Sequence, residues 1–430
     1  MAEYGFIHIP WKTEMSDSPQ TVPVLNLSRL RSEFPALKND CVFFDNAGGS
    51  QVLKRVADRI HDYLLSTSVQ IGASYRTSQL ASEKVLAARR SVAELMNASR
   101  DEEIVMGGSS TGLMFLLTQA ILPSICPGDE IIITNSDHES NIGAWMRLQK
   151  AGAVIKIWEV NKDFTLPLDQ LDRLLSSRTK WVAMTHASNV LGTVNPVAEV
   201  AKRMHAVGAR LCVDGVAYAA HRLVDVQASG ADMYVFSFYK VYGPHYAVLW
   251  GKRDFLLSLP TLNHHFIGPE DLPYKLQPGN VNFELSYGCI GISDYFIQTG
   301  KDLGAQGTNR QCMQLAFDHF AQHEDKLSGK LLAFLRSKST VRIIGFDQVK
   351  NGNRMPTISF VVEGKQSEEI VLFLDKFNIG IRFGDFYAKR LIETLGLLPY
   401  GGVVRVSLAH YNTEAEVDLL IEKLELALTT

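Results

Sequence analysis

Short apolar runs rich in branched side chains alternate, from about residue 50 to residue 300, with longer stretches whose apolar residues recur at helical spacing. The spacing of Val52, Val56 and Ile60 predicts a helix over Gln51–Ser66, and Ser78–Met96 carries the same pattern. The predicted strands are Glu103–Met106, Glu130–Thr134, Val154–Val160, Lys180–Thr185, Arg210–Val213, Asp232–Phe236 and Tyr246–Trp250. Strands that are apolar nearly throughout are buried on both faces, so the pattern predicts a mostly parallel seven-stranded sheet covered by helices.

The pattern changes after about residue 300. A long helical stretch begins at Asn309. The apolar runs that follow it, separated by helical segments, are Val341–Gly345, Thr357–Val362, Ile379–Phe383 and Val403–Leu408. Thr413 with Glu416 three residues later forms a capping box, which predicts the start of the last helix. We therefore expect an α/β chain with an irregular lead-in over residues 1–25, a large domain over 26–300 and a smaller C-terminal α+β domain over 301–430.

Composition narrows the class of protein. The 430 residues carry 43 basic and 46 acidic side chains, a formal net charge of −3, which gives no electrostatic support for a nucleic-acid or membrane-surface partner. No apolar run approaches the ~18–20 residues that a membrane helix needs, and the first twenty residues lack the apolar core of a signal peptide. The five cysteines form no CxxC pair and are too scattered for a disulfide framework or a zinc site. We expect a reducing, cytoplasmic compartment and no metal.

Ligands of open parallel sheets collect at the carboxyl ends of the strands. The predicted strand Glu103–Met106 is followed by Gly107–Gly112, a segment of small and hydroxyl residues that precedes a helical stretch. Backbone N–H groups and the positive end of the helix dipole suit a phosphate at such a place. The same segment is also compatible with a simple helix-capping turn. As a G-x-S-x-G match it further fits the nucleophile elbow of an α/β-hydrolase, with Ser110 as the nucleophile.

Two more strand ends carry ionisable residues. Asp214 directly follows the strand Arg210–Val213, where a carboxylate is costly unless something needs its charge; otherwise it caps the next turn. Lys240 comes soon after Asp232–Phe236, either as a surface lysine or as an amine kept partly deprotonated at a dry strand end. A phosphate cradle, a carboxylate and a buried lysine are together what pyridoxal 5'-phosphate (PLP) requires. The ordered trio, rather than any one segment, predicts this cofactor.

Four further segments carry a resemblance that extends from about Leu27 to Leu428. They are Phe43–Gly49, Ser136–Ile142, Ser188–Thr193 and Val404–Thr413. Together with Asp214 and Lys240 they resemble the class V aminotransferase family of fold-type-I PLP enzymes, and within it the cysteine-desulfurase-like proteins. The resemblance implies PLP fold type I, a homodimer with shared active sites, and a small-molecule amino acid as the substrate.

The resemblance also implies roles for individual residues. Lys240 would form the Schiff base, Asp214 would pair with the pyridinium nitrogen, and His138 would stack on the pyridine ring. The cofactor-binding residues that it implies are Ser109, Ser110, Thr111, His138, Asn189, Asp214, Ser237, Tyr239, Lys240 and Asn280. Arg405 would bind the substrate α-carboxylate through two hydrogen bonds. The substrate-binding residues that we expect are Asn46, Arg76, Arg382 and Arg405.

Four positions depart from the desulfurase pattern. Ala217 stands where the desulfurases have Gln, and Tyr239 precedes the lysine where His is common. Asn280 replaces the Thr that desulfurases present to the partner subunit's phosphate. Ile381–Tyr387 aligns with the loop that holds the desulfurase nucleophile, and Tyr387 occupies the position of the cysteine. A phenol cannot form a persulfide, but near the α-carbon it can donate or accept a proton.

We therefore expect a PLP-dependent enzyme that acts at the α-carbon of an amino acid through an external aldimine and a quinonoid. Its outcome would be that of a lyase, epimerase, cyclase or transferase, and its catalytic residues would be His138, Asp214, Lys240 and Tyr387. A true cysteine desulfurase, a C–S lyase or an aminotransferase is the alternative. An α/β-hydrolase using Ser110 leaves Lys240, Asn189 and Arg405 unexplained. A non-catalytic PLP-binding protein is disfavoured because the lysine, the aspartate and the arginine are all present.

Overall fold

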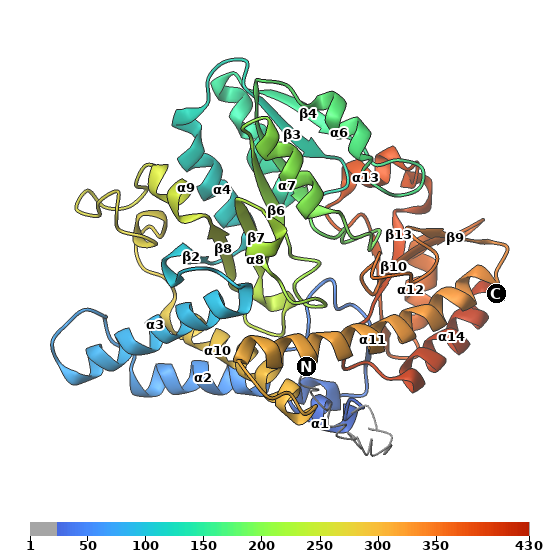
Figure 1. Cartoon of the computed structure of the whole chain (residues 1–430). Helices are drawn as coiled ribbons and strands as arrows, with labels where there is room; N and C mark the ends of the chain where they lie inside the picture. Colours follow the sequence, from blue (N-terminus) through green and yellow to red (C-terminus); the bar gives the residue numbers. More distant parts are fainter. Residues whose placement is uncertain (1–23, 430) are drawn as a thin grey trace, which may run out of the picture.

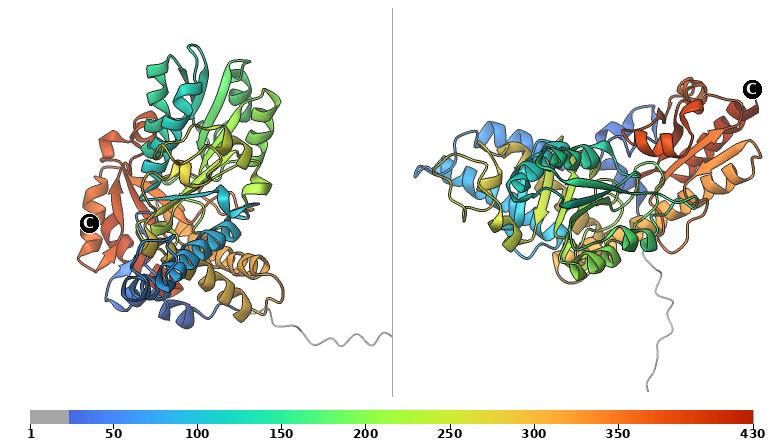
Figure 2. Two further views of the ribbon diagram at one scale, coloured as in Figure 1. Left: turned by 90° about the vertical axis from the view of Figure 1, so that its left-hand side faces the viewer. Right: turned by 90° about the horizontal axis from the view of Figure 1, so that it is seen from above.

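The computed structural model describes residues 24–429, which form two main β-sheets and the helices that cover them (Figure 1). The larger sheet belongs to the first two thirds of the chain and the smaller one to the last third. In the turned views the C-terminal unit lies at one end of the molecule, beside the larger unit (Figure 2). The predicted lead-in over residues 1–25 falls, except for its last two residues, outside the described residues.

Seven strands make up the larger sheet. They are β2 (Ile104–Gly107), β3 (Glu130–Thr134), β4 (Val154–Trp158), β5 (Thr179–Thr185), β6 (Arg210–Asp214), β7 (Met233–Ser237) and β8 (Ala247–Gly251). Their order across the sheet is β2-β8-β7-β6-β5-β3-β4, and β8 runs antiparallel to both of its neighbours while the other pairs are parallel. The predicted mostly parallel seven-stranded sheet is confirmed, and every predicted run overlaps an observed strand.

The helices follow the predicted alternation with the strands. Their bounds are α1 (Leu27–Ser32), α2 (Lys54–Ser66), α3 (Arg76–Met96), α4 (Ser110–Ile121), α5 (Glu139–Met146), α6 (Leu168–Leu174), α7 (Val197–Ala206), α8 (Val226–Ser229), α9 (Arg253–Ser258), α10 (Phe283–Asp302), α11 (Asn309–Arg336), α12 (Ser367–Asp375), α13 (Lys389–Thr394) and α14 (Glu414–Thr429). The helices predicted over Gln51–Ser66 and Ser78–Met96 are α2 and α3, which begin three residues later and two residues earlier.

Successive residues of the central strands enter two different hydrophobic cores, one on each face of the sheet. In β3, Ile131 and Ile133 join the core formed with α4 and α5, whereas Ile132 joins the core formed with α7 and α10. Neither face of these central strands meets water, so neither alternating set of their side chains is polar. This is why the strands appear in the sequence as continuous apolar runs.

The smaller sheet contains β9 (Val341–Ile344), β10 (Thr357–Val362), β12 (Arg382–Gly384) and β13 (Val403–Ser407), in the antiparallel order β12-β13-β10-β9. The prediction of a single strand over Ile379–Phe383 was wrong. Its first residues form β11 (Ile379–Gly380), which pairs in parallel with β1 (Val42–Phe43), and its last residues begin β12. The segment divides because Ile379 pairs with Val42, far away in the chain, whereas Arg382 pairs with Arg405 of the nearby β13.

Beyond β1, the segment Phe44–Gly49 runs between the two sheets. Asp45 forms a β-bridge with Ser407 of β13, and the backbone carbonyl of Ala47 accepts a hydrogen bond from Lys240 of the larger unit. We propose a domain boundary near residue 300, where α10, which packs on α2 and α3, gives way to α11, which also packs on α14.

The predicted capping box is confirmed at the start of α14. The Thr413 amide donates to Glu416 Oε2 over 2.8 Å, and the Glu416 amide donates to Thr413 Oγ1 over 3.1 Å. Among residues 24–429, no helix combines the length and the apolar character that crossing a membrane requires.

A close contact between α10 and α11 provides a test of the packing. A Cβ atom on Gly300 would overlap the backbone carbonyl of Cys312, whereas a Cβ on Gly329 of α11 would meet no atom within 4 Å. Gly300→Ala should destabilise the protein by about 1–3 kcal/mol because the backbone cannot move aside easily. Gly329→Ala is the matched control and should stabilise by up to about 1 kcal/mol through helix propensity. Denaturant unfolding checks both; equal stability of the two variants would contradict the packing described.

Candidate active site

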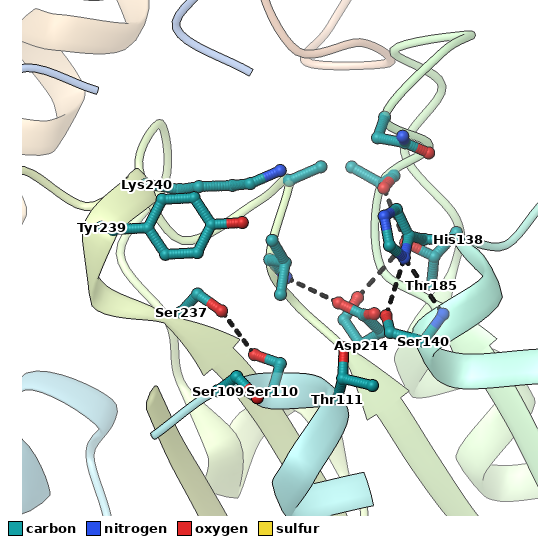
Figure 3. A pocket seen from close by; sticks show the side chains of 14 residues that line it. Ser109, Ser110, Thr111, His138, Ser140, Thr185, Asp214, Ser237, Tyr239 and Lys240 are labelled. Carbon is teal, nitrogen blue, oxygen red and sulfur yellow. Dashed lines mark hydrogen bonds between the residues drawn. The ribbon is translucent and has the colours of Figure 1, made fainter. Parts of the chain in front are cut away.

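The carboxyl ends of β2, β3, β5, β6 and β7 meet at one edge of the larger sheet, because the two antiparallel pairings of β8 leave β2 pointing the same way as the others. A cavity that opens to solvent lies at this edge (Figure 3). Its walls are Ser109, Ser110, Thr111, His138, Ser140, Thr185, Ala187, Asn189, Asp214, Val216, Ala217, Ser237, Tyr239 and Lys240. Nine of the ten predicted cofactor-binding residues therefore line one cavity; Asn280 does not.

One end of the cavity is built from hydroxyl groups. Ser109 caps α4, its Oγ accepting the Gly112 amide over 3.0 Å. The Oγ of Ser110, on the first residue of α4, lies 2.7 Å from the Oγ of Ser237 at the end of β7. Ser110 follows β2 and Ser237 ends β7, and the two residues lie close because β8 alone separates β2 from β7. A helix start surrounded by hydroxyl groups is suited to an anion such as a phosphate.

Asp214, the last residue of β6, lies at the floor of the cavity with 3% of its surface exposed. Its Oδ1 accepts the Val216 amide over 2.9 Å. Burial raises the pKa of this carboxyl to about 6, against the opposing effects of that hydrogen bond and of the Lys240 charge. The turn after Asp214 packs tightly on the Tyr234 ring, which a Cβ on Gly215 would overlap, so glycine is required there. A buried carboxylate held in this way can stabilise a protonated ring nitrogen.

Lys240 ends a short 3₁₀ turn, Phe238–Lys240, that directly follows β7. Its Nζ donates to the carbonyl of Ala47 over 2.7 Å. Burial, and next the positive charge of Arg405, lower the pKa of this amine to about 8. Roughly a fifth of the Lys240 population is therefore neutral at pH 7.4, far more than for an exposed lysine, and the neutral amine is the form that attacks a carbonyl.

His138 stands across the cavity from Lys240 and Tyr239 (Figure 3). It caps α5, and its Nδ1 accepts the Ser140 amide over 3.1 Å and lies 2.8 Å from Ser140 Oγ. Burial, with the positive charges of Lys240 and Arg405, lowers the pKa of the imidazole to about 4. The ring is therefore neutral at pH 7 and presents an uncharged aromatic face.

Arg405 on β13 is almost fully buried and does not line the cavity itself, but it contacts Asn189 of the cavity wall from the smaller sheet. Its Nη1 donates to the Asn189 carbonyl over 3.2 Å, and its Nη2 donates to Asp45 Oδ1 over 3.1 Å. The Phe386 ring covers the guanidinium at 3.7 Å from the ring centroid. Asn189 also donates from its side chain to the Phe386 carbonyl over 3.0 Å, so this residue ties the Phe386 loop to the cavity.

Other predicted residues lie outside the cavity wall. Tyr387 is exposed, with its ring centroid 5.2 Å from that of His138. The Asn46 side chain is engaged inside the protein, where it donates to the Ser407 carbonyl and to Asn412 Oδ1. Arg76 is an exposed residue at the start of α3, and the exposed Arg382 lies 3.6 Å from Asp45. Asn280 lines a separate groove with Gly107, Gly108 and Leu285.

Sequence reasoning missed several residues of the site. Thr185 and Ala187 follow the apolar run of β5, and this strand end could have been searched as the others were. Ser140 lies inside the His138 motif but was given no role. Asp45 lies beside Asn46 in a quoted motif, yet nothing local shows that it pairs with an arginine 360 residues away.

Comparison with known proteins identifies the family. Residues 42–271 and 303–420 match the family model described as Aminotransferase class-V. The chain belongs to the class V aminotransferase family. The aminotransferase-like protein FGM3 of Gibberella zeae is 41% identical over 94% of this chain and 98% of its own length. The cysteine desulfurase-like protein ustD of Aspergillus flavus is 32% identical over 94% of this chain and 90% of its own length.

The fold comparison agrees. The crystal structure of the cysteine desulfurase CsdA from Escherichia coli matches with a TM-score of 0.81 and 26% identity, covering 94% of this chain and 99% of that one. The class V aminotransferases are PLP-dependent, so this chain is a PLP-dependent enzyme of fold type I. The residues present fit that cofactor: one cavity joins hydroxyl groups at a helix start, a buried carboxylate and a partly neutral amine.

The lowered pKa of Lys240 gives a pH prediction that requires no turnover. In cofactor-free protein, methylation of Lys240 by formaldehyde and cyanoborohydride should rise with a midpoint near pH 8, because the neutral amine reacts. Exposed lysines should follow the reference pKa of about 10.4. Arg405→Gln should move the Lys240 midpoint upward, since it removes a repelling charge. Peptide mass spectrometry reads both; a Lys240 midpoint above pH 10 would contradict the burial described.

Proposed function

We propose that this enzyme acts at the α-carbon of an amino-acid substrate and does so without a persulfide-forming cysteine. The observation that carries the proposal is the juxtaposition of Lys240, Asp214 and Arg405: an amine and a carboxylate share one cavity, and a buried guanidinium lies close enough to lower the pKa of the amine. Amine, carboxylate and α-carbon of an amino acid would each meet a suitable group there.

Side chains of the cavity walls would hold the cofactor. Ser109, Ser110, Thr111 and Ser237 would bind the phosphate through their hydroxyl groups and the first amides of α4. His138, neutral at pH 7, would lie against the ring face, and Tyr239 and Asn189 would border it. Asn280 would act from the partner subunit of a homodimer.

Each ionisable group of the site would have one task in catalysis. When bound, PLP withdraws electrons from the substrate α-carbon. Asp214 would keep a proton on the ring nitrogen, and Lys240 would move the α-proton as the general base. Arg405 would hold the substrate carboxylate, with Asn46, Arg76 and Arg382 as the other substrate-side candidates. Tyr387, next to His138, would donate or accept a second proton.

The position of the thiols supports a reaction other than desulfuration. Cys41 and Cys126 are exposed, and Cys212, Cys289 and Cys312 are buried in the hydrophobic interior. Within residues 24–429, no cysteine lines the cavity. A lyase, epimerase, cyclase or transferase outcome therefore remains the proposal, with a desulfurase, C–S lyase or aminotransferase as the alternative.

The geometry gives no support to a hydrolase that uses Ser110. Its hydroxyl bonds to Ser237, whereas His221 bonds to Glu324 and His245 stacks on Tyr239. A serine nucleophile needs a histidine base within hydrogen-bond reach, and neither of these imidazoles is paired with Ser110.

The cofactor assignment is tested by mass mapping. Borohydride treatment of the yellow holoenzyme should leave a pyridoxyl mass on Lys240, and Lys240→Ala should lose both the adduct and turnover of L- and D-amino acids in a substrate panel. Lys275 is an internal control, because it is also buried but its Nζ donates to the carbonyls of Leu257 and Pro269 outside the cavity. An adduct on Lys275 instead of Lys240 would refute the assignment.

Tyr387 stands at the position of the desulfurase cysteine, so the cysteines and this phenol can be tested together. Incubation with L-cysteine should give no persulfide on any of the five cysteines, because no thiol faces the cavity. With amino acids that are turned over, Tyr387→Phe should lower the rate by roughly 100-fold if its phenol transfers a proton. Tyr274→Phe, at another partly exposed tyrosine, is the control and should leave the rate unchanged. A stable, transferable persulfide would return the protein to the desulfurases.

A further inference from the structure

Asp45 lies between two arginines of the smaller sheet. Its Oδ1 accepts Arg405 Nη2 over 3.1 Å, and its Oδ2 lies 3.6 Å from Arg382 Nη1. Arg382 and Arg405 are direct partners across the antiparallel β12–β13 pair. Like charges directly opposite each other on neighbouring strands repel, so a carboxylate between them relieves that repulsion.

One N–H group of the Arg405 guanidinium has no hydrogen-bond partner in the described structure. Nη1 is satisfied by the Asn189 carbonyl and Nη2 by Asp45, but the buried Nε has no hydrogen-bond partner among residues 24–429. Nε and Nη2 point along the same edge of a guanidinium, the edge that accepts a carboxylate through two parallel hydrogen bonds. Asp45 uses only half of that edge.

The two arginines differ in their access to water. The side chain of Arg405 is 1% exposed and that of Arg382 is 57% exposed, while the Asp45 side chain between them is 18% exposed. A buried guanidinium without a counter-charge is unfavourable, so Asp45 stabilises Arg405 while no other anion is bound. Arg382 remains hydrated and can accept or release a partner at little cost.

We propose that Asp45 is a resident carboxylate that neutralises Arg405 before substrate binds and then shifts wholly to Arg382 when the substrate α-carboxylate takes the Nε–Nη2 edge. This inference rests on the proposed function, since it assumes a carboxylate-bearing substrate at Arg405. Asp45 is then a positioning and selectivity residue: a ligand that lacks a carboxylate cannot replace it on Arg405.

The surroundings of Asp45 suit such a shift. A Cβ on Gly48 would come within 2.5 Å of Asp45 Oδ2, so glycine at this position leaves the carboxylate the space that it occupies. The next residues of the same segment lead to Ala47, whose carbonyl accepts Lys240 Nζ. The carboxylate and the amine are thus held by one short stretch of chain, Asp45–Ala47.

Two matched probes separate this role from a structural one. 2-Aminoisobutyric acid carries an amine and a carboxylate but no α-proton, and its amide differs only in lacking the carboxylate. Titration calorimetry of the holoenzyme at 0.15 M salt, where exposed charges are largely screened, gives Kd for each probe. The variants are Asp45→Asn, Arg382→Gln and the double variant, with Asp58→Asn as the control, an exposed carboxylate of α2 that pairs with Lys54. Asp45→Ser is a second replacement should Asp45→Asn fold poorly.

Asp45→Asn should tighten binding of the acid by roughly tenfold, because the acid no longer displaces a charged competitor, and should leave binding of the amide unchanged. Arg382→Gln should weaken binding of the acid by about threefold in the native background and have no effect in the Asp45→Asn background. Asp58→Asn should change neither affinity by more than about twofold, because its ion pair with Lys54 is exposed.

Three results would overturn the inference. Equal or weaker binding of the acid by Asp45→Asn would show that Asp45 does not compete for Arg405. A loss from Arg382→Gln that persists in the Asp45→Asn background would show that Arg382 contacts the probe directly. Equal affinity of the native enzyme for the acid and its amide, with the cofactor present on Lys240, would show that Arg405 does not bind the carboxylate of the acid. Absence of the cofactor from Lys240 would instead refute the proposed function itself.

Discussion

Removal of charged groups from water at one edge of the larger sheet is the constraint on which this protein depends. Burial moves each group toward its neutral form: the pKa of Asp214 rises to about 6, that of Lys240 falls to about 8 and that of Arg405 falls to about 10. The cost of burying each group is reduced because a fixed dipole or an opposite charge lies close to it. Asp214 accepts a hydrogen bond from the Val216 amide, and Lys240 donates one to the Ala47 carbonyl. Arg405 donates to the carboxylate of Asp45.

Both sheets are needed to satisfy these groups. Asp214 and Lys240 come from the larger sheet and Arg405 from the smaller one, while the Phe44–Gly49 segment runs between them and contacts both sides. Asn189 adds a further link, since its backbone carbonyl accepts Arg405 and its side chain donates to Phe386. A change in how the two units pack would therefore alter the charge balance of the cavity directly.

The Phe386–Tyr387 loop occupies the side of the cavity where the desulfurase-like relatives are expected to carry their nucleophile. Both residues have positive φ angles, 53° and 59°, which bulky side chains adopt only at an energetic cost. The loop is held by hydrogen bonds from Asn189 to the Phe386 carbonyl and from the Glu139 amide to the Tyr387 carbonyl. Strain retained beside a cavity, with Phe386 over Arg405, fits a loop that shapes the substrate side of the site.

The sequence by itself determined the features that depend on neighbours in the chain. Apolar runs marked all seven strands of the larger sheet, the Thr413–Glu416 spacing marked the start of α14, and the strand ends led to Asp214 and Lys240. These succeed because strand burial, helix capping and the position of a strand's carboxyl end are local properties. Only the tertiary structure decided the rest. It divided Ile379–Phe383 between two sheets, engaged Asn46 in the interior and set Asp45 between Arg382 and Arg405. Each of these outcomes depends on at least one contact between segments more than 300 residues apart.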